Sequence, residues 1–352
     1  MKLALVISTL GAGGAERAAA RLAAQWSAAG HDVTVITFSA GSFYEFPAPV
    51  KRLELTGAGG RIAGNLRRVL SLAGAVRGLK PDAVVSFMDQ TNVTALLASF
   101  FFGAPVIVTE HADPRQYSPG RAWELLRRLL YPRAAAFVAV SRGALEGFPP
   151  ALRRRGTVIY NPVDPPPAPA AGEARKVIGV GRLSREKGFD LLIEAFAAAA
   201  AENPGWELEI FGDGPERAAL EAQIDRLGLR GRARLPGRTP DVYGELGRAG
   251  IFVLPSRFES FGIALCEAMA CGLPVVSFDC PTGPAEIITA GEDGLLVKNG
   301  DAAALAAALG ALMRDTGRRR ALGGRAAQSA ARYFTPAIAM QWELLLGDMT
   351  RR

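Results

Sequence analysis

Cysteine and histidine are scarce in this chain, whose 352 residues include three cysteines and two histidines. Cys266, Cys271 and Cys280 form no C-x-x-C pair, so neither a disulfide framework nor a zinc site is predicted. We interpret them as buried small apolar residues. No Asp-x-Asp pair occurs, so the usual carboxylate clamp for a nucleotide-bound magnesium or manganese ion has no source. The sequence therefore favours chemistry without a metal or a cofactor.

Long apolar runs are also missing. No uninterrupted stretch reaches the roughly 18 residues that a membrane span requires. Residues 1–8 predict a buried strand that leads into a glycine loop, whereas a secretory signal has a longer apolar core and a small-residue cleavage site. We therefore expect a cytoplasmic protein. With 49% hydrophobic residues, the chain is long enough for two domains that each have a core.

The positive charge is unevenly distributed. Residues 1–168 hold 19 Lys and Arg against 11 Asp and Glu, whereas residues 169–352 hold 22 against 23. An anionic membrane surface would attract the basic first half, but basic side chains also coat ordinary solvated faces, and both interpretations stay open. Nucleic acid is not an expected partner, because no recognised binding motif accompanies the basic residues. The basic segments are Arg61, Arg67, Arg68, Arg77 and Lys80, and then the leucine-rich helix from Trp123 to Tyr131 with Arg133.

Strand patterns alternate with helix patterns in both halves of the chain. Residues 161–169 between the halves contain five prolines and indicate a linker. The alternation predicts an α/β fold with two doubly wound parallel-sheet domains, in which loops at the carboxyl ends of the strands carry function. Expected strands are 3–8, 33–38, 83–87, 106–109, 136–140, 176–180, 206–211 and 251–254; expected helices are 15–28, 190–201, 216–227 and 263–270.

Two carboxylates flank the junction between the last of these strands and its helix. Glu259 lies at the mouth of the helix and Glu267 about two turns along it. The unpaired amides at a helix N-terminus attract a diphosphate, and ionised carboxylates accept hydrogen bonds from sugar and ribose hydroxyls. The alternative is that Glu259 is a neighbour of the helix N-cap and interacts favourably with the helix dipole, and that Glu267 is a solvated helix residue.

Two glycine-rich loops follow predicted strands. In the first, Gly11-x-Gly13 is followed by Glu16 where a dinucleotide-binding dehydrogenase has its third glycine, so that class is disfavoured. In the second, residues 181–188 place Arg182 and Lys187 between a strand and a helix. Two cations there would neutralise a diphosphate without a metal.

These segments together carry a family resemblance. The chain resembles the retaining glycosyltransferases of family four, whose GT-B fold has two Rossmann-like domains facing a central cleft. Residues 109–114 and 279–286 further resemble members that add UDP-linked hexoses or N-acetylhexosamines during the assembly of bacterial polysaccharides or lipid-linked oligosaccharides. The family resemblance itself rests on residues 13–17, 180–188, 211–216, 259–267 and 270–276.

The resemblance implies a donor site in the second half. Arg182 and Lys187 would bind the diphosphate, Glu267 the ribose hydroxyls and Glu259 the hydroxyls of the donor sugar. Arg238 would lie beside the nucleotide base, which the family binds largely through backbone contacts, so its side chain need not contribute. The remaining donor contacts would come from Gly13 and Gly14, which leave room for the phosphate, and from the amides of Phe261, Gly262, Ile263, Ala264 and Leu265.

The remaining implied residues concern the transferred sugar and the acceptor. His111 would hydrogen-bond the donor sugar and, with Glu259, Arg182 and Lys187, form the catalytic set; a capping loop histidine is the alternative. Glu110 and Asp113 would contact the acceptor or support the loop. Thr282 would line the sugar pocket or belong to a proline-rich turn.

The implied domains are residues 1–165 with a crossing helix at about 335–352, which hold the acceptor, and residues 170–333, which hold the donor. We expect transfer of a hexose or N-acetylhexosamine from a UDP-sugar to a lipid-linked or polysaccharide acceptor, with the enzyme cytoplasmic or peripheral on the inner membrane face. Two alternatives remain: a sugar-nucleotide epimerase on the same fold, and a non-catalytic subunit that binds nucleotide sugars.

Overall fold

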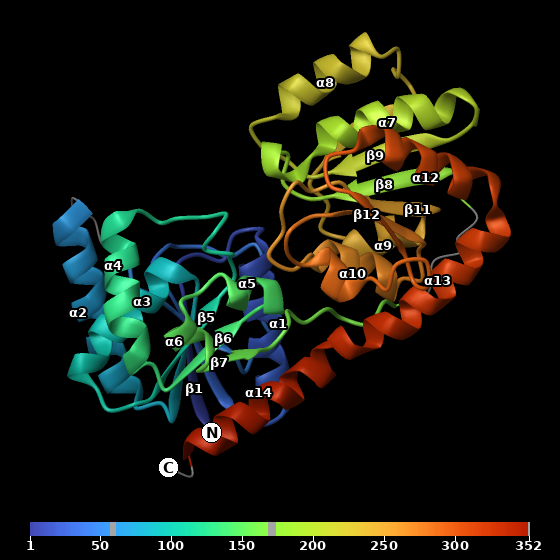
Figure 1. Ribbon diagram of the computed structural model, residues 1–352. Helices are drawn as coiled ribbons and strands as arrows, with labels where there is room; N and C mark the ends of the chain where they lie inside the picture. Colours follow the sequence, from blue (N-terminus) through green and yellow to red (C-terminus); the bar gives the residue numbers. More distant parts are fainter. Residues whose placement is uncertain (57–60, 168–173, 351–352) are drawn as a thin grey trace. The chain divides into compact units, whose positions relative to one another are not determined.

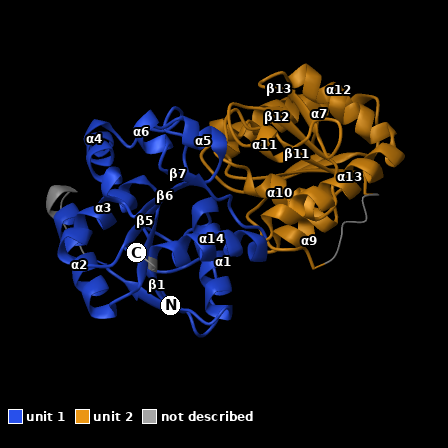
Figure 2. Cartoon of the chain, turned by 60° about the horizontal axis from the view of Figure 1, so that its bottom comes forward, with its two compact units in different colours: residues 1–163, 335–352 blue, residues 164–334 orange. Residues whose placement is uncertain are grey.

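The computed structural model describes residues 1–56, 61–167 and 174–350, without the side chains of residues 61–63 and 350. The chain divides into two compact units, which Figure 2 colours separately. Unit 1 comprises residues 1–163 and 335–352, and unit 2 comprises residues 164–334. Ala168 and Pro169 of the expected linker lie outside the described residues, as does the side chain of Arg61.

Unit 1 is built on a parallel sheet with strand order β3-β2-β1-β4-β5-β6-β7. Alternate residues of β1 enter different cores: Leu3 and Leu5 pack into one cluster, and Ala4 and Val6 into another. Both faces of the sheet are therefore buried, which explains the continuous apolar strand patterns. The strands are β1 Lys2–Ile7, β2 Asp32–Thr37, β3 Lys51–Glu54, β4 Ala83–Phe87, β5 Val106–Glu110, β6 Ala136–Ala139 and β7 Gly156–Val158.

The helices of unit 1 lie between these strands, apart from one that comes from the end of the chain (Figure 1). They are α1 Gly14–Ala28, α2 Arg61–Leu79, α3 Asp89–Ala98, α4 Arg121–Leu130, α5 Arg142–Glu146, α6 Pro150–Arg153 and α14 Thr335–Thr350, with the short 3-10 helices η1 Ser99–Phe101 and η2 Tyr131–Arg133.

Helix α14 packs against α1. The ring of Trp342 meets the ring of Trp26 edge to face, with centroids 5.7 Å apart. Ile338 and Leu346 are completely buried in the same cluster. His31 Nε2 lies 2.9 Å from the carboxylate of Glu343, which adds a polar contact to the apolar seam. The final helix is therefore part of the core of unit 1.

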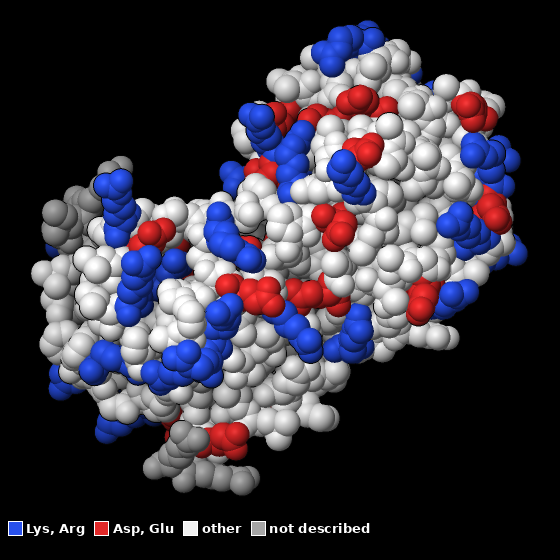
Figure 3. Space-filling view, viewed as in Figure 1, with Lys and Arg blue, Asp and Glu red and all other residues white. Residues whose placement is uncertain are grey.

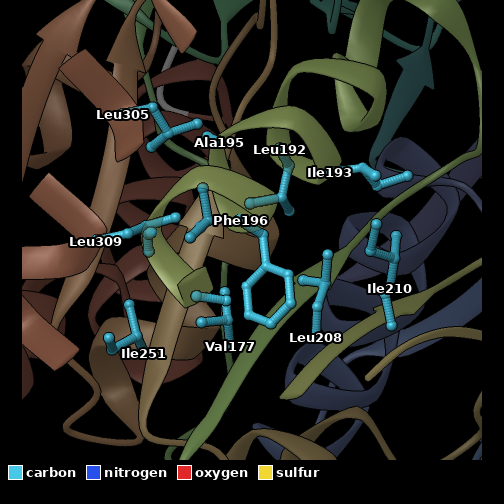
Figure 4. Close-up of a cluster of buried hydrophobic side chains, with 14 of the residues drawn as sticks. Val177, Leu192, Ile193, Ala195, Phe196, Leu208, Ile210, Ile251, Leu305 and Leu309 are labelled. Carbon is cyan, nitrogen blue, oxygen red and sulfur yellow. The ribbon is translucent and has the colours of Figure 1, made fainter. Parts of the chain in front are cut away.

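Unit 2 repeats the architecture, with a parallel sheet of order β10-β9-β8-β11-β12-β13. Phe196 of α7 lies among Val177 of β8 and Leu208 and Ile210 of β9, as Figure 4 shows. The strands are β8 Lys176–Val180, β9 Glu207–Phe211, β10 Ala233–Gly237, β11 Ile251–Leu254, β12 Val275–Asp279 and β13 Leu295–Lys298. The helices are η3 Arg185–Lys187, α7 Phe189–Ala201, α8 Arg217–Arg226, α9 Val242–Gly247, α10 Ile263–Ala270, α11 Pro284–Ile287, α12 Ala302–Arg314, α13 Thr316–Ala330 and η4 Ala331–Tyr333.

The three cysteines of unit 2 are free and buried, as the sequence predicted. Burial raises the pKa of both Cys271 and Cys280 to about 12, so these thiols stay protonated at neutral pH. Their part in the structure is packing rather than chemistry.

Replacing Trp342 by alanine is expected to destabilise unit 1 by about 3–5 kcal/mol, because the change leaves a cavity against Trp26. Leu344 of the same helix is 69% exposed, so Leu344→Ala should change the stability by less than about 0.5 kcal/mol. Native-state hydrogen exchange of the α1 and β1 amides measures both effects in unit 1 alone. Equal losses in the two variants would contradict the packing of α14 on α1.

Candidate functional site

Two loops of unit 2 begin where the neighbouring parallel strands β8 and β11 end. The chain continues from β8 to one side of the sheet and from β11 to the other. In doubly wound sheets, ligands bind outside the carboxyl ends of the strands at this switch point. The loop after β8 carries Arg182 and Lys187, and the loop after β11 carries Glu259. The sheet thus places three predicted site residues at one edge.

Lys187 and Glu259 contact each other directly. Lys187 Nζ lies 2.6 Å from Glu259 Oε1, and Ser256 Oγ donates a hydrogen bond to the same oxygen at 2.7 Å. Glu259 is 8% exposed, so the pair is largely shielded from water. Removing either partner would leave a poorly solvated charge without compensation. The sequence analysis assigned Lys187 to the diphosphate and Glu259 to the sugar hydroxyls of a donor. In the structure, the two side chains form an ion pair with each other.

The backbones of the two loops are fixed to one another. Gly188 has a φ of +65°, and a Cβ atom at this position would lie 2.0 Å from the carbonyl oxygen of Pro255. Only glycine allows this approach. Arg257 donates two hydrogen bonds to the carboxylate of Asp190, at 2.8 and 2.6 Å, and one to the carbonyl of Arg185 at 2.7 Å. These backbone and side-chain contacts between the two loops therefore fix the distance between Lys187 and Glu259.

The start of α10 differs in one respect from the predicted amide cradle. Leu265 donates its N–H to the carbonyl of Gly262 at 3.0 Å, so this amide is already engaged and the prediction for it is wrong. The first helical N–H groups, those of Ile263 and Ala264, have no partner within the helix. The ring of Phe261 is buried against the ring of Tyr333, with centroids 5.4 Å apart, and anchors the turn.

The other predicted donor residues lie in different surroundings. Glu267 is completely buried in α10, so a ribose reaches its carboxylate only if neighbouring chain moves. The Thr282 hydroxyl donates to the backbone carbonyl of Glu259, so Thr282 supports the loop instead of presenting its hydroxyl to a sugar. Arg182 and Arg238 are exposed, and in the part of the chain that the structure describes no hydrogen bond or ion pair engages the Arg182 guanidinium.

In the first glycine loop, in unit 1, the carboxylate of Glu16 lies next to Gly13. Gly13 precedes α1 and Gly14 begins it, and a Cβ atom on Gly13 would lie 2.2 Å from Glu16 Oε2. Burial raises the pKa of Glu16, although a hydrogen bond from its own backbone N–H opposes the rise. Tyr44 donates its hydroxyl to the Gly13 carbonyl at 3.0 Å. An ionised Glu16 would oppose the phosphate approach that the sequence predicted here.

Glu110 ends β5 inside the protein. It is 1% exposed and accepts a hydrogen bond from the Tyr131 hydroxyl, which in turn accepts one from Asn92 Nδ2 at 3.0 Å. Burial raises the pKa of Glu110 from 4.5 to about 7, although the Tyr131 bond and the charge of Arg127 oppose this rise. The contacts support a structural part for Glu110 rather than direct contact with an acceptor.

His111 and Asp113 follow Glu110 in the same loop. His111 stacks on Phe87 of β4, with ring centroids 5.4 Å apart, and its Nε2 lies 3.1 Å from Thr109 Oγ1. Burial lowers the pKa of His111 to about 3, so the imidazole is neutral at physiological pH. Asp113 is buried and pairs with Arg115 at 2.9 Å, a contact that supports the loop.

Sequence reasoning missed five residues that hold these groups in place. Spacing gives no signal for Tyr131, Thr109 or Asp190, because each meets its partner only through the fold. Ser256 and Arg257 lie within the segment that drew attention to Glu259, and their hydroxyl and guanidinium groups were the available signal. Within residues 1–56, 61–167 and 174–350, no group of three or more His, Cys, Asp or Glu side chains is arranged to hold a metal ion.

Comparison with known proteins gives two family matches that together cover most of the chain. Residues 163–329 match the family model described as glycosyl transferases group 1, and residues 13–164 match the glycosyl transferase 4-like domain. The chain belongs to glycosyltransferase family four. Its two parallel-sheet domains are those of the GT-B fold. The sequence prediction of family and fold is therefore confirmed.

Curated relatives come from several bacteria. An exopolysaccharide phosphotransferase of Streptomyces coelicolor is 34% identical over 80% of this chain, but the chain spans only 28% of that relative. An N-acetyl-D-galactosaminyltransferase of Campylobacter jejuni, named for an undecaprenol diphosphate-linked glycan, is 28% identical over 99% of both chains. The solved structure of HepE from Anabaena with UDP and glucose has a TM-score of 0.85 at 24% identity and 99% coverage of both chains.

Glu110→Gln is expected to change how stability depends on pH. Folded Glu110 keeps its proton up to a pKa of about 7, whereas the unfolded residue loses it near 4.5, so its stabilising contribution is full below pH 4.5 and is lost as the pH rises through 7. Glutamine does not titrate. The stability of the wild type relative to the variant should therefore fall by roughly 3 kcal/mol between pH 4 and pH 8.

Urea unfolding at a series of pH values measures this difference. Glu146→Gln, at an exposed position on α5, is the matched control and should leave the pH dependence as in the wild type. A wild-type-minus-Glu110→Gln difference that is the same at pH 4 and pH 8 would contradict the buried, protonated carboxyl.

Proposed function

We propose that the chain is a retaining, metal-independent glycosyltransferase that moves a hexose or N-acetylhexosamine from a UDP-sugar to a lipid-linked or polysaccharide acceptor. The observation that carries this proposal is the Lys187–Glu259 contact at the switch point of unit 2, with Arg182 in the same loop as Lys187. A cation for phosphate and a carboxylate for hydroxyls lie side by side there, as recognition of a sugar nucleotide requires.

The donor diphosphate would compete with Glu259 for Lys187. A phosphate oxygen accepts the lysine charge, and Glu259 keeps the Ser256 hydrogen bond while it turns to the sugar hydroxyls. Arg182 supplies a second positive charge, and the first amides of α10 supply the positive end of a helix dipole. UDP is the favoured nucleotide because HepE, which shares the fold, was solved in complex with UDP-glucose.

Chemistry at this site would consist mainly of stabilising the leaving group. As the bond between the anomeric carbon and the diphosphate oxygen breaks, Arg182, Lys187 and the α10 amides stabilise the negative charge on the diphosphate. The acceptor hydroxyl forms the new bond on the same face and gives its proton to the departing phosphate, so the configuration is retained without a protein nucleophile. His111, neutral at physiological pH, would hydrogen-bond the sugar instead of transferring a proton.

The acceptor class follows from the relatives. The Campylobacter jejuni enzyme is named for an undecaprenol diphosphate-linked glycan, and another relative, AmsD of Erwinia amylovora, is an amylovoran biosynthesis glycosyltransferase that is 26% identical over 98% of this chain. We infer a lipid-linked or growing polysaccharide acceptor for this chain.

Lys187→Ala and Glu259→Gln should separate donor binding from turnover. Loss of the lysine charge should weaken UDP binding and lower acceptor-free hydrolysis of UDP-sugars by on the order of 100-fold. Loss of the glutamate charge should leave UDP affinity unchanged or raise it, because an anion beside the phosphates has gone, while hydrolysis still falls. Calorimetry with UDP and a coupled assay for released UDP measure the two quantities.

The matched control is Arg226→Ala, which removes an exposed arginine of α8 that belongs to neither loop and should change neither quantity. Weaker UDP binding in Glu259→Gln than in Lys187→Ala would refute the assignment. Acceptor-free conversion of UDP-N-acetylglucosamine to its epimer would support the epimerase instead, and UDP binding without turnover on any donor would support a binding subunit.

We also propose a peripheral membrane contact through α4 of unit 1. Leu125 and Leu129 are 58% and 63% exposed on this helix, and Arg121 and Arg128 are exposed beside them. In Figure 3, Lys and Arg atoms gather over the part of unit 1 that Figure 1 labels α4 and α6. The proposed contact lies at the surface of the membrane, and among the described residues no helix is both long and apolar enough to cross a bilayer. A pocket of about 490 Å³ beside α4 is lined by Arg128, Pro132, Pro149, Ala151, Leu152 and Arg155.

Exposed leucines flanked by arginines are typical of a helix that lies in the interface of an anionic bilayer. The double variant Leu125→Gln with Leu129→Gln should lose most flotation with vesicles that contain phosphatidylglycerol. The matched control is Met340→Gln with Leu344→Gln on α14, which removes side chains that are 66% and 69% exposed but have no arginine or lysine within the helix. Flotation that ignores the anionic lipid content, or equal losses in both double variants, would refute the proposed surface.

A further inference from the structure

The ends of β4 and β5 in unit 1 hold the imidazole of His111 in a defined position. The ring stacks on Phe87 at an angle of 29°, and Thr109 lies two residues before His111 on the same strand end. Thr109 is 1% exposed, and its carbonyl accepts hydrogen bonds from the Met88 N–H at 3.0 Å and from Asn92 Nδ2 at 2.8 Å. The backbone of Thr109 is therefore held in place, and its side chain is buried.

The Thr109 hydroxyl makes two polar contacts but has only one proton. Its Oγ1 lies 2.9 Å from the carbonyl oxygen of Ser86 and 3.1 Å from His111 Nε2. The carbonyl has no proton to give, so the contact with Ser86 uses the threonine proton. The contact with His111 is then a hydrogen bond only if Nε2 carries a proton and donates it to Oγ1.

This arrangement leaves Nδ1 without a proton. Burial lowers the pKa of His111 to about 3, so the ring is neutral and carries one N–H. Nδ1 is buried and has no hydrogen-bond partner in the part of the chain that the structure describes. An unpaired buried acceptor costs free energy that a donor group arriving there would recover.

We propose that Thr109 is a positioning residue that holds His111 in the Nε2–H tautomer, so that Nδ1 accepts a hydrogen bond from a hydroxyl of the bound sugar once the groups that cover Nδ1 move aside. The recognition of a sugar rests on the proposed function, whereas the tautomer depends on Thr109 and Ser86 alone. The chemistry is selective, because a hydroxyl or amide N–H can donate to Nδ1 but a phosphate oxygen or a carbonyl cannot.

The tautomer can be measured directly because the chain has only two histidines. Protein labelled with ¹⁵N in the imidazole rings gives two sets of long-range ¹H–¹⁵N couplings at pH 7, and His31→Gln assigns the set of His111. The wild type should show one tautomer with the proton on Nε2. Thr109→Val, which keeps the shape and removes the hydroxyl, should show mixed tautomers or a proton on Nδ1, and Thr109→Ser should restore the wild-type pattern.

A wild-type His111 protonated on Nδ1, or a Thr109→Val protein with an unchanged tautomer, would overturn the proposal. The wild-type measurement decides even if Thr109→Val fails to fold. A kinetic readout tests the link to the sugar: Thr109→Val should lower the turnover of a UDP-sugar at least tenfold with UDP affinity unchanged, and Thr109→Ser should recover it. If the chain turns over no UDP-sugar, the proposed function fails while the tautomer result still stands or falls by itself.

Discussion

The contact between Lys187 and Glu259 joins the two loops that carry the candidate donor residues of unit 2. A carboxylate beside an anion-binding lysine is unfavourable for phosphate unless the lysine can be released from it. Ser256 would support such a release, because its hydroxyl already donates a hydrogen bond to Glu259 Oε1 that does not depend on the lysine. Gly188 and the Arg257–Asp190 contact hold the loop backbones, so the exchange would take place through side-chain motion. In the proposed reaction, Lys187 and Glu259 therefore compensate each other's charge until the donor binds.

The two units use the same constraint for different chemistry. Parallel strands bring their carboxyl ends to one edge, and each unit carries its candidate residues there. Unit 2 gathers charge at this edge, with Arg182, Lys187 and Glu259. In unit 1, burial disfavours the charged forms of two candidate residues: it raises the pKa of Glu110 to about 7 and lowers the pKa of His111 to about 3. Charged groups suit a diphosphate, whereas neutral hydrogen-bonding groups suit the hydroxyls of sugars.

The sequence predicted the fold class and part of the elements, because both depend on local patterns. The strand at Ala83–Phe87 and the helix at Ile263–Ala270 were predicted with the bounds that the structure gives them. The edge strands β3 and β7 were not predicted, because Lys51–Glu54 and Gly156–Val158 are short and only partly buried, and an apolar pattern is missing. The hydrogen-bond partners of the site residues could not be predicted from the sequence. The Thr282 hydroxyl meets a carbonyl 23 residues away, and Leu265 uses its amide within the turn.

Geometry in unit 1 also bears on the choice between transfer and epimerisation. Epimerisation on a sugar nucleotide needs a group that takes a proton and a group that returns one, both within reach of the ring. The pKa of Glu110, about 7, would suit a base, but its carboxyl group is buried and bonded to Tyr131. His111 is too weak a base to hold a proton at neutral pH. Neither residue is placed for proton transfer, which favours sugar transfer, with the leaving group as its own base, over epimerisation.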